Sequence, residues 1–100
     1  MPYISEEERE NLDSAIDQLT LAIKNINSLD NPNDFSVYLG RINYCFSRVL
    51  SGVMGKVSYS KIAMATGVLE NIKQEFYRRV AEKYEDSKIV TNGDIKEYKI

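Results

Sequence analysis

Apolar residues recur at alternating spacings of three and four in separate segments of this chain, and this pattern constrains the fold more than any other feature. Such spacing places apolar side chains on one face of an α-helix. The segments are separated by the turn-rich run NSLDNPND and by Gly52 and Gly55, which weaken helices. Short connections make sequential helices antiparallel neighbours. The sequence therefore predicts an all-α fold, a three-helix up-down bundle with a short C-terminal tail or hairpin.

The first predicted helix begins after Ser5, which forms a capping box with Glu8 three residues later. Acidic residues in its first turn complement the helix dipole. Its apolar stripe consists of Leu12, Ile16, Leu19, Ile23 and Ile26.

The second predicted helix begins at Asn33 or Asp34 and ends near Met54, and the third begins after the cap Ser58 and ends near Lys83. Both carry an apolar stripe at helical spacing. In the second helix the stripe is Phe35, Tyr38, Leu39, Ile42, Phe46, Val49 and Val53, and in the third it is Ile62, Ala65, Leu69, Ile72, Phe76 and Val80.

The end of the chain carries the only strand-like signal, because Asn92-Gly93 stands between two short β-prone runs in KIVTNGDIKEY. An isolated hairpin is marginally stable in water, so such a tail is either disordered or docked on another surface. We therefore expect a bundle domain over residues 1–86 and a tail over residues 87–100, with docking of the tail on a neighbouring subunit as the specific hypothesis.

Composition excludes several classes of partner. The chain has 100 residues, enough for one domain, and a formal net charge of −2, which argues against binding driven by bulk attraction to nucleic acid. Cys45 is the single cysteine, so no intramolecular disulfide can form, which fits a reducing cytosol. No run is long and apolar enough to cross a bilayer. We expect a cytoplasmic protein without a membrane partner.

The usual machinery of catalysis is missing. The chain has no histidine, which removes the commonest general base and metal ligand. It contains no phosphate-binding loop, no dinucleotide fingerprint and no zinc-protease motif. Glu85, Asp86 and Asp94 lack the spacing of a calcium-binding loop. The sequence therefore predicts a protein that is not an enzyme and that uses no metal or cofactor.

Several arginine and tyrosine residues lie outside the apolar stripes of the predicted helices. Arg41, Tyr44 and Arg48 share one face of the second predicted helix, away from its stripe. Such a face suits stacking on a base and gripping of phosphate, and it equally suits a hot spot in a protein interface. An edge tyrosine can also simply pack its ring, and an edge arginine can pair with a nearby carboxylate. The predicted ligand-binding residues are Tyr44, Arg48, Tyr77 and Arg79, and the second-ranked candidates are Arg41 and Arg78.

The opening MPYI, the stretch INYCFSRVLSGVMG and the run EFYRRV followed by YED and NGD resemble a family of small proteins from bacteriophages and bacteria. That family has no assigned function. The resemblance implies a phage context, with the host cytosol as its compartment, and it implies no activity. It marks as pattern-bearing Asn43, Tyr44, Arg48, Tyr59, Glu75, Tyr77, Arg78, Arg79, Tyr84, Asn92 and Asp94.

Two classes of function follow from these residues. In the first, the protein is a non-catalytic, oligomeric binder that sequesters a phosphate-bearing, cyclic nucleotide-like signal, as a phage anti-defence sponge would. Boundaries between subunits then form pockets lined by tyrosine for stacking and arginine for phosphate. In the second, the protein is an interaction module that binds or inhibits a host protein, and the acidic strip of Glu6, Glu10, Asp13 and Asp17 contributes to that surface. Self-association as a homodimer or higher oligomer is expected, because the outward face with Val37, Tyr44 and Arg48 and the tail after Tyr84 both need partners.

Overall fold

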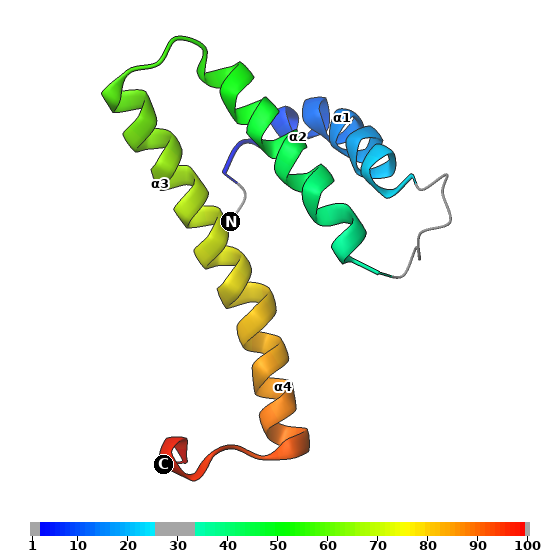
Figure 1. Cartoon of the computed structure of the whole chain (residues 1–100), viewed down its shortest axis with the longest axis vertical. Helices are drawn as coiled ribbons and strands as arrows, with labels where there is room; N and C mark the ends of the chain where they lie inside the picture. The colour runs from blue at the N-terminus through cyan, green and yellow to red at the C-terminus, as the bar shows by residue number, and fades with distance from the viewer. Residues whose placement is uncertain (1–2, 26–33, 100) are drawn as a thin grey trace. The chain divides into compact units, whose positions relative to one another are not determined.

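The computed structural model describes residues 3–25 and 34–99, and in these ranges it contains helices and no strand. The all-α prediction is confirmed. The elements in chain order are α1 (Glu6–Lys24), α2 (Ser36–Met54), α3 (Tyr59–Phe76), the π-helix η1 (Tyr77–Ala81), α4 (Glu82–Asn92) and the short 3₁₀ helix η2 (Lys96–Tyr98), as Figure 1 shows. The chain divides into two units, Met1–Val53 and Met54–Ile100, and each is described by itself. The up-down bundle arrangement of the helices stays a prediction.

The start of α1 is fixed by the predicted capping box. The Ser5 Oγ accepts a hydrogen bond from the Glu8 backbone N–H at 3.2 Å, and the Glu8 side chain accepts one from the Ser5 N–H at 3.4 Å. Two of the amide groups that a helix N-terminus leaves without partners are thereby satisfied. The predicted stripe of α1 is present through Ile23, and its last member, Ile26, lies outside the described residues.

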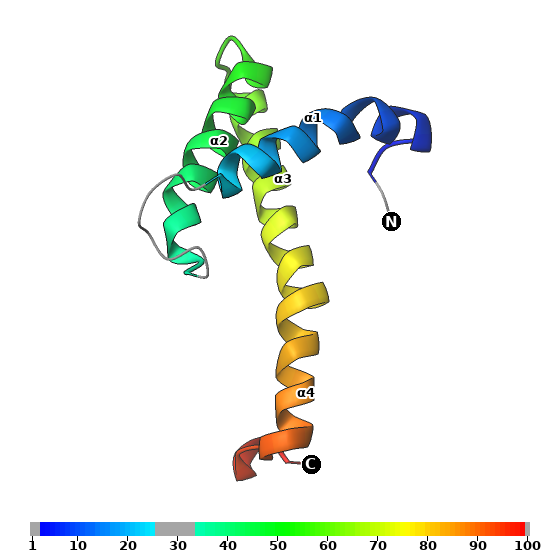
Figure 2. The ribbon, with the colours of Figure 1, turned by 90° about the vertical axis from the view of Figure 1, so that its right-hand side faces the viewer.

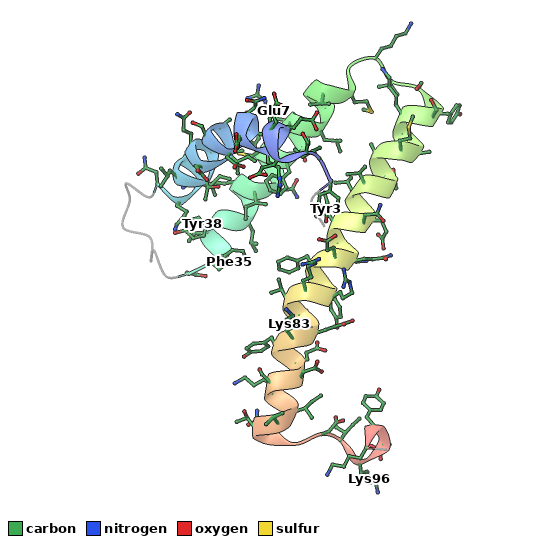
Figure 3. The ribbon with its side chains drawn as sticks, turned by 180° about the vertical axis from the view of Figure 1, so that it is seen from behind. Tyr3, Glu7, Phe35, Tyr38, Lys83 and Lys96 are labelled. Atoms are coloured by element: carbon green, nitrogen blue, oxygen red, sulfur yellow. The ribbon has the colours of Figure 1, made fainter. Side chains whose placement is uncertain are left out.

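The start of α2 is held by Asp34. Its carboxylate accepts hydrogen bonds from the Ser36 N–H at 3.0 Å and from the Ser36 hydroxyl at 2.6 Å, and these bonds lower the pKa of Asp34. Of the two predicted starting residues, Asn33 lies outside the described part of the chain. Phe35 and Tyr38 meet edge to face just after this turn, with ring centroids 6.3 Å apart, and Figure 3 shows both side chains at this end of α2.

Residues 55–58 connect α2 to α3. Gly55 has a φ of +65°, a left-handed conformation that favours glycine. The predicted cap is present, because the Ser58 Oγ accepts a hydrogen bond from the Lys61 N–H at 3.2 Å. The Lys61 Nζ donates to the carbonyl oxygen of Met54, the last residue of α2, and to that of Lys56 in the connection, at 3.0 Å each. A positive charge thus lies at the C-terminal end of α2.

The predicted end of the third helix at Lys83 is wrong, because α3, η1 and α4 follow one another without a break from Tyr59 to Asn92. Figure 2 shows this segment as one uninterrupted helical ribbon. The polar run after Lys83 supports its own helix: the Ser87 hydroxyl donates to the Tyr84 carbonyl at 2.7 Å, and the Thr91 hydroxyl donates to the Ser87 carbonyl at 3.1 Å. These hydroxyls find partners in the helix itself, so a short apolar stripe does not mark the end of the helix.

The hairpin expected at Asn92-Gly93 is also wrong. Asn92 ends α4, and Gly93, with a φ of +82°, donates its N–H to the Ile89 carbonyl at 2.8 Å. Glycine with a positive φ serves a helix C-terminus as well as a hairpin turn, so the dipeptide signal has two meanings. The expected domain boundary at residues 86 and 87 consequently falls inside α4.

The apolar stripes do not form a closed core in the described residues. None of residues 3–25 and 34–99 is buried, and Leu69 and Phe76 keep 49% and 62% of their surface exposed. A soluble chain of this length normally buries well over half of its unfolded surface. Within the described residues the stripes are therefore exposed apolar surfaces.

Candidate functional site

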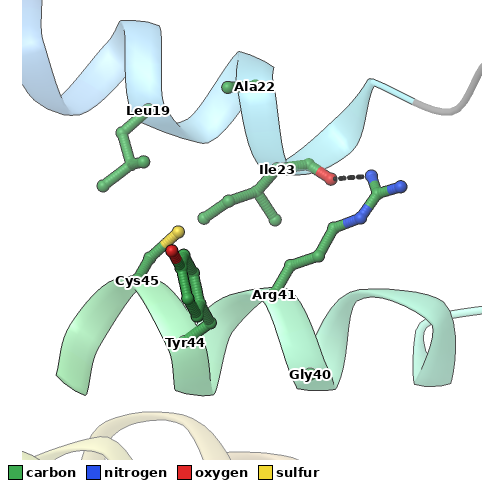
Figure 4. A pocket seen from close by; sticks show the side chains of 7 residues that line it. All are labelled: Leu19, Ala22, Ile23, Gly40, Arg41, Tyr44 and Cys45. Atoms are coloured by element: carbon green, nitrogen blue, oxygen red, sulfur yellow. Dashed lines mark hydrogen bonds between the residues drawn. The ribbon is translucent and has the colours of Figure 1, made fainter. Parts of the chain in front are cut away.

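Arg41 joins the two helices of the first unit. Its Nη1 donates hydrogen bonds to the carbonyl oxygen of Ile23 at 2.8 Å and to that of Asn25 at 2.9 Å. These carbonyls lie at the C-terminal end of α1, where backbone acceptors lack helical partners and the helix dipole is negative. Figure 4 shows the guanidinium reaching from α2 to this end of α1. The structure thus places Arg41 in a structural contact, and its donors are partly used.

Tyr44 and Arg48 form a pair one turn further along α2. The Arg48 guanidinium carbon lies 5.7 Å from the centroid of the Tyr44 ring, within the range of a cation–π contact. One guanidinium nitrogen also donates to the Tyr44 hydroxyl at 3.5 Å, a long hydrogen bond. Both side chains are exposed, and no carboxylate of the described residues forms an ion pair with Arg48. Most of the guanidinium donors therefore remain available to an anion.

Two open hollows adjoin this pair, on the side of α2 that faces α1. One has a volume of about 330 Å³ and is bounded by Arg41, and the other has about 240 Å³ and is bounded by Arg48. Leu19, Tyr44 and Cys45 line both hollows, so the tyrosine ring stands between the two arginines. Figure 4 shows Tyr44 and Cys45 projecting from α2 toward Leu19 on α1. We call this region the Tyr44 groove.

A larger groove lies along the apolar stripes of α1 and α2. Its volume is about 600 Å³, and its walls are almost entirely apolar. It is lined by Ile16, Leu19, Thr20, Ile23, Lys24, Phe35, Tyr38, Ile42 and Phe46. We call it the apolar groove. The predicted stripes of both helices thus face a shared space that they do not fill.

The remaining predicted residues belong to η1, in the second unit. The Tyr77 hydroxyl donates to the Glu85 Oε1 at 3.2 Å, and this bond raises the pKa of Tyr77, with smaller contributions from the charges of Glu85 and Glu82 and from burial. Arg79 forms an ion pair with Glu75, with its Nε 3.3 Å from the carboxylate. Arg78 is exposed, and no ion pair joins it to another described residue.

The predicted residues therefore fall into two groups. Arg41, Tyr44 and Arg48 come together on α2 in the first unit, and Tyr77, Arg78 and Arg79 follow one another in η1 in the second. The carboxylate pairing anticipated for an edge arginine is found at Arg79 with Glu75.

Sequence reasoning missed the contacts that the groove makes with α1. The α1 stripe already contained Leu19, but nothing in the pattern of α2 alone indicated that Arg41 would reach the end of another helix. Cys45 lay between the apolar stripe and the arginine face, and it is half-buried in the Tyr44 groove. The bond from Tyr77 to Glu85 spans a π-turn, which places the two side chains on one line of the helix.

The side chains of the Tyr44 groove are of types that suit binding. Arginine donors suit oxyanions, the tyrosine ring suits a flat apolar group, and Leu19 and Cys45 supply an apolar floor. Within the described ranges, no group of three or more acidic or cysteine side chains is arranged to hold a metal ion. No described helix has the length and hydropathy needed to span a membrane.

Comparison with known proteins gives a family and no activity. No curated protein and no solved structure matches the chain. A family model described as a domain of unknown function, DUF6899, matches residues 1–95, which is nearly the whole sequence. This agrees with the resemblance of the sequence motifs to a family of unassigned function. The chain belongs to the DUF6899 family.

Proposed function

We propose that this protein is a non-catalytic binding protein that sequesters a small phosphate-bearing ligand of the cyclic nucleotide type, and that it works as a homo-oligomer. The observation that carries the proposal is the Tyr44–Arg48 pair, in which an exposed guanidinium that forms no ion pair with a described carboxylate lies 5.7 Å from an exposed aromatic ring. An unpaired arginine held by an aromatic ring is oriented for an anion and pays little entropy to receive one.

The surroundings of the pair fit a nucleotide in chemistry and size. Arg48 offers a planar fork of donors to a phosphate, and Tyr44 offers a ring beside an apolar floor for a base. Arg41 and Arg48 stand two helical turns apart, about 10 Å along α2. Among the described residues Arg41 bonds to α1 through its Nη1, and we propose that its other donors serve a second phosphate group. The hollow of about 330 Å³ beside Tyr44 is at the lower end of the size range of small-molecule sites, and the hollow of about 240 Å³ adjoins it across the same ring.

The resemblance of the sequence to phage proteins supports a biological role for ligand binding in the infected host. A phage protein that binds a host signalling nucleotide without cleaving it lowers the free concentration of that signal in the host cytosol. Such a protein needs binding residues and no general base, and arginine and tyrosine provide binding. An anti-defence function of this kind is the biological part of our proposal.

A thermal-shift screen with cyclic dinucleotides, cyclic trinucleotides and NAD-derived signals tests the proposal. A bound ligand raises the melting temperature by mass action and is recovered intact after heat denaturation. Arg48→Lys should abolish most of the shift, because an ammonium group cannot reproduce the bidentate fork. Arg9→Lys is the matched control, since Arg9 lies on α1 and lines neither hollow.

Two results would contradict ligand binding at this groove. One is the absence of a shift with every compound of the screen. The other is a shift that Arg48→Lys and Tyr44→Ala leave unchanged, which would move the site elsewhere.

The apolar groove favours a second candidate function, binding of a host protein. An open apolar channel of about 600 Å³ between two helices suits the apolar face of a partner helix. In this case a pull-down from host lysate should capture a specific protein. Ile42→Asp, in the wall of the groove, should release that protein, while Arg48→Ala should retain it.

A further inference from the structure

The helical segment from Tyr59 to Asn92 carries an apolar stripe that stays on one face for longer than it would in a regular α-helix. Ile72, Phe76, Val80 and Tyr84 follow one another at steps of four residues. Each such step overshoots a full turn of an α-helix by about 40°, so three steps would carry Tyr84 about 120° away from Ile72. The π-turn of η1, Tyr77–Ala81, has more residues per turn and removes much of this drift. These four side chains therefore share one face, which we call the distal face.

Neither α1 nor α2 is as long as the helix that carries this stripe. From Tyr59 to Asn92 the helix extends about 50 Å, whereas α1 and α2, with 19 residues each, extend about 28 Å. Val80 and Tyr84 lie about 32 Å and about 38 Å from Tyr59, beyond the length of α2. Ile16, Leu19 and Ile23 of α1 already line the apolar groove that it shares with α2.

We propose that the distal face is covered by the distal face of a second copy of this chain, in a dimer with twofold symmetry. This deepens the self-association in the proposed function by naming its surface. A twofold interface uses the same patch on both copies, and a patch of two aromatic and two β-branched side chains is complementary to itself.

The exposed area of the distal face is sufficient for a specific dimer. Ile72, Phe76, Val80 and Tyr84 keep 56%, 62%, 51% and 62% of their surfaces exposed. Side chains of this size, half exposed, offer roughly 100 Å² each. In a dimer, the four side chains of each copy and the aliphatic stems of the flanking Arg79 and Lys83 together bury on the order of 1,000 Å². This total area is the lower limit for a specific interface.

The charges beside the distal face do not oppose this pairing. Arg79 is neutralised by Glu75 in its own helix, at 3.3 Å. On the other edge, the Tyr77 hydroxyl is held by Glu85. The Lys88 ammonium lies 5.4 Å from the centroid of the Tyr84 ring, so each copy also brings a cation to the end of this face. The pairing we propose keeps this cation at the solvated rim, where like charges need not be desolvated against each other.

The test is the mass in solution of the full chain and of two variants, measured by light scattering after size exclusion at about 50 µM. The unaltered chain should have the mass of two chains or a multiple of two. Val80→Glu should have the mass of a single chain, because the dimer would have to desolvate a carboxylate among the apolar side chains of the face. Val90→Glu is the matched control: Val90 belongs to the same long helix, is 87% exposed and lies off the distal face, so the dimer should persist.

A single-chain mass for the unaltered protein would overturn the proposal, and so would an unchanged mass for Val80→Glu. A melting temperature lowered by Val80→Glu while every protein has a single-chain mass would show that this face packs within its own chain.

If Val80→Glu loses the circular dichroism signal of its helices, the mass measurement on that variant is replaced by a cross-linking experiment. On a Cys45→Ala background, Val80→Cys should be joined into dimers by a short bismaleimide, and Val90→Cys should not. Equal cross-linking at both positions, or none at either, would contradict the proposed surface. Ligand binding is tested separately, by the thermal-shift screen. A raised melting temperature with ligand in a protein of single-chain mass would contradict only the dimer proposal. A dimer whose melting temperature no ligand raises would contradict only the nucleotide-binding proposal.

Discussion

The Nη1 of Arg41 lies 2.8 Å from the carbonyl oxygen of Ile23, and this hydrogen bond ties α2 to the last turn of α1. The same nitrogen lies 2.9 Å from the carbonyl oxygen of Asn25, the residue that caps α1. One cation thus satisfies two backbone acceptors and complements the negative end of the helix dipole. The position of α1 on α2 depends on this arginine more than on tight packing, since the space between the two helices is open.

Arg41→Ala should therefore destabilise the first unit. The expected loss is about 1 kcal/mol, because the bonds involve a charged donor but lie at an exposed site. Urea denaturation followed by circular dichroism measures the change in the free energy of unfolding.

The control for this substitution is Arg48→Ala, which removes the same charge from the same helix without breaking a bond to α1. It should change the free energy of unfolding by less than about 0.5 kcal/mol, as surface substitutions usually do. Equal losses for the two variants would show that the tie between Arg41 and α1 does not stabilise the protein.

The sequence predicted the helices well because their signals are local. The capping box of Ser5 and Glu8 and the cap at Ser58 are contained in a few residues, and the structure has both. The end of the last helix was missed for the same reason. A stripe records where a helix has an apolar face, whereas a polar helix such as α4 continues on backbone and hydroxyl hydrogen bonds alone.

The candidate site was predictable in its residue types and not in its contacts. The phase of α2 placed Arg41, Tyr44 and Arg48 on one face, and the structure has Tyr44 and Arg48 in contact. The partners on α1 could not be predicted, since they depend on how the two helices approach each other. Periodicity fixes directions around a helix axis, but it contains no information about the neighbouring helix.

Gly93 offers a test of the revised C-terminus. Its φ of +82° and ψ of 176° belong to a region that is essentially restricted to glycine, and no atom within 4 Å would obstruct an added Cβ. Gly93→Ala should therefore destabilise the end of α4 through backbone strain alone, by about 1 kcal/mol or more. Hydrogen exchange of the last amides of α4 should report faster opening.

Gly67→Ala is the opposite case in the same long helix. Gly67 lies in α3, and an added Cβ there would also meet nothing within 4 Å. Alanine in a helix interior is favoured over glycine by about 1 kcal/mol, so this variant should gain stability. Stabilisation by both substitutions would argue against the observed C-cap, and destabilisation by both would place an unseen neighbour beside Gly67.

The bond from Tyr77 to Glu85 gives the second unit a pH dependence. Because the hydrogen bond favours the neutral phenol, the pKa of Tyr77 in the folded protein is above its ordinary value of about 10. The stabilisation from this contact is therefore fully present below about pH 10 and is lost as the pH rises through the raised pKa.

The difference between the ultraviolet titrations of the unaltered chain and Tyr77→Phe isolates this one phenol. Glu85→Gln should return its pKa toward 10, and Glu82→Gln, which removes only the weakest of the contributions, should move it much less. A Tyr77 pKa that Glu85→Gln leaves unchanged would show that the contact across the π-turn does not form in solution.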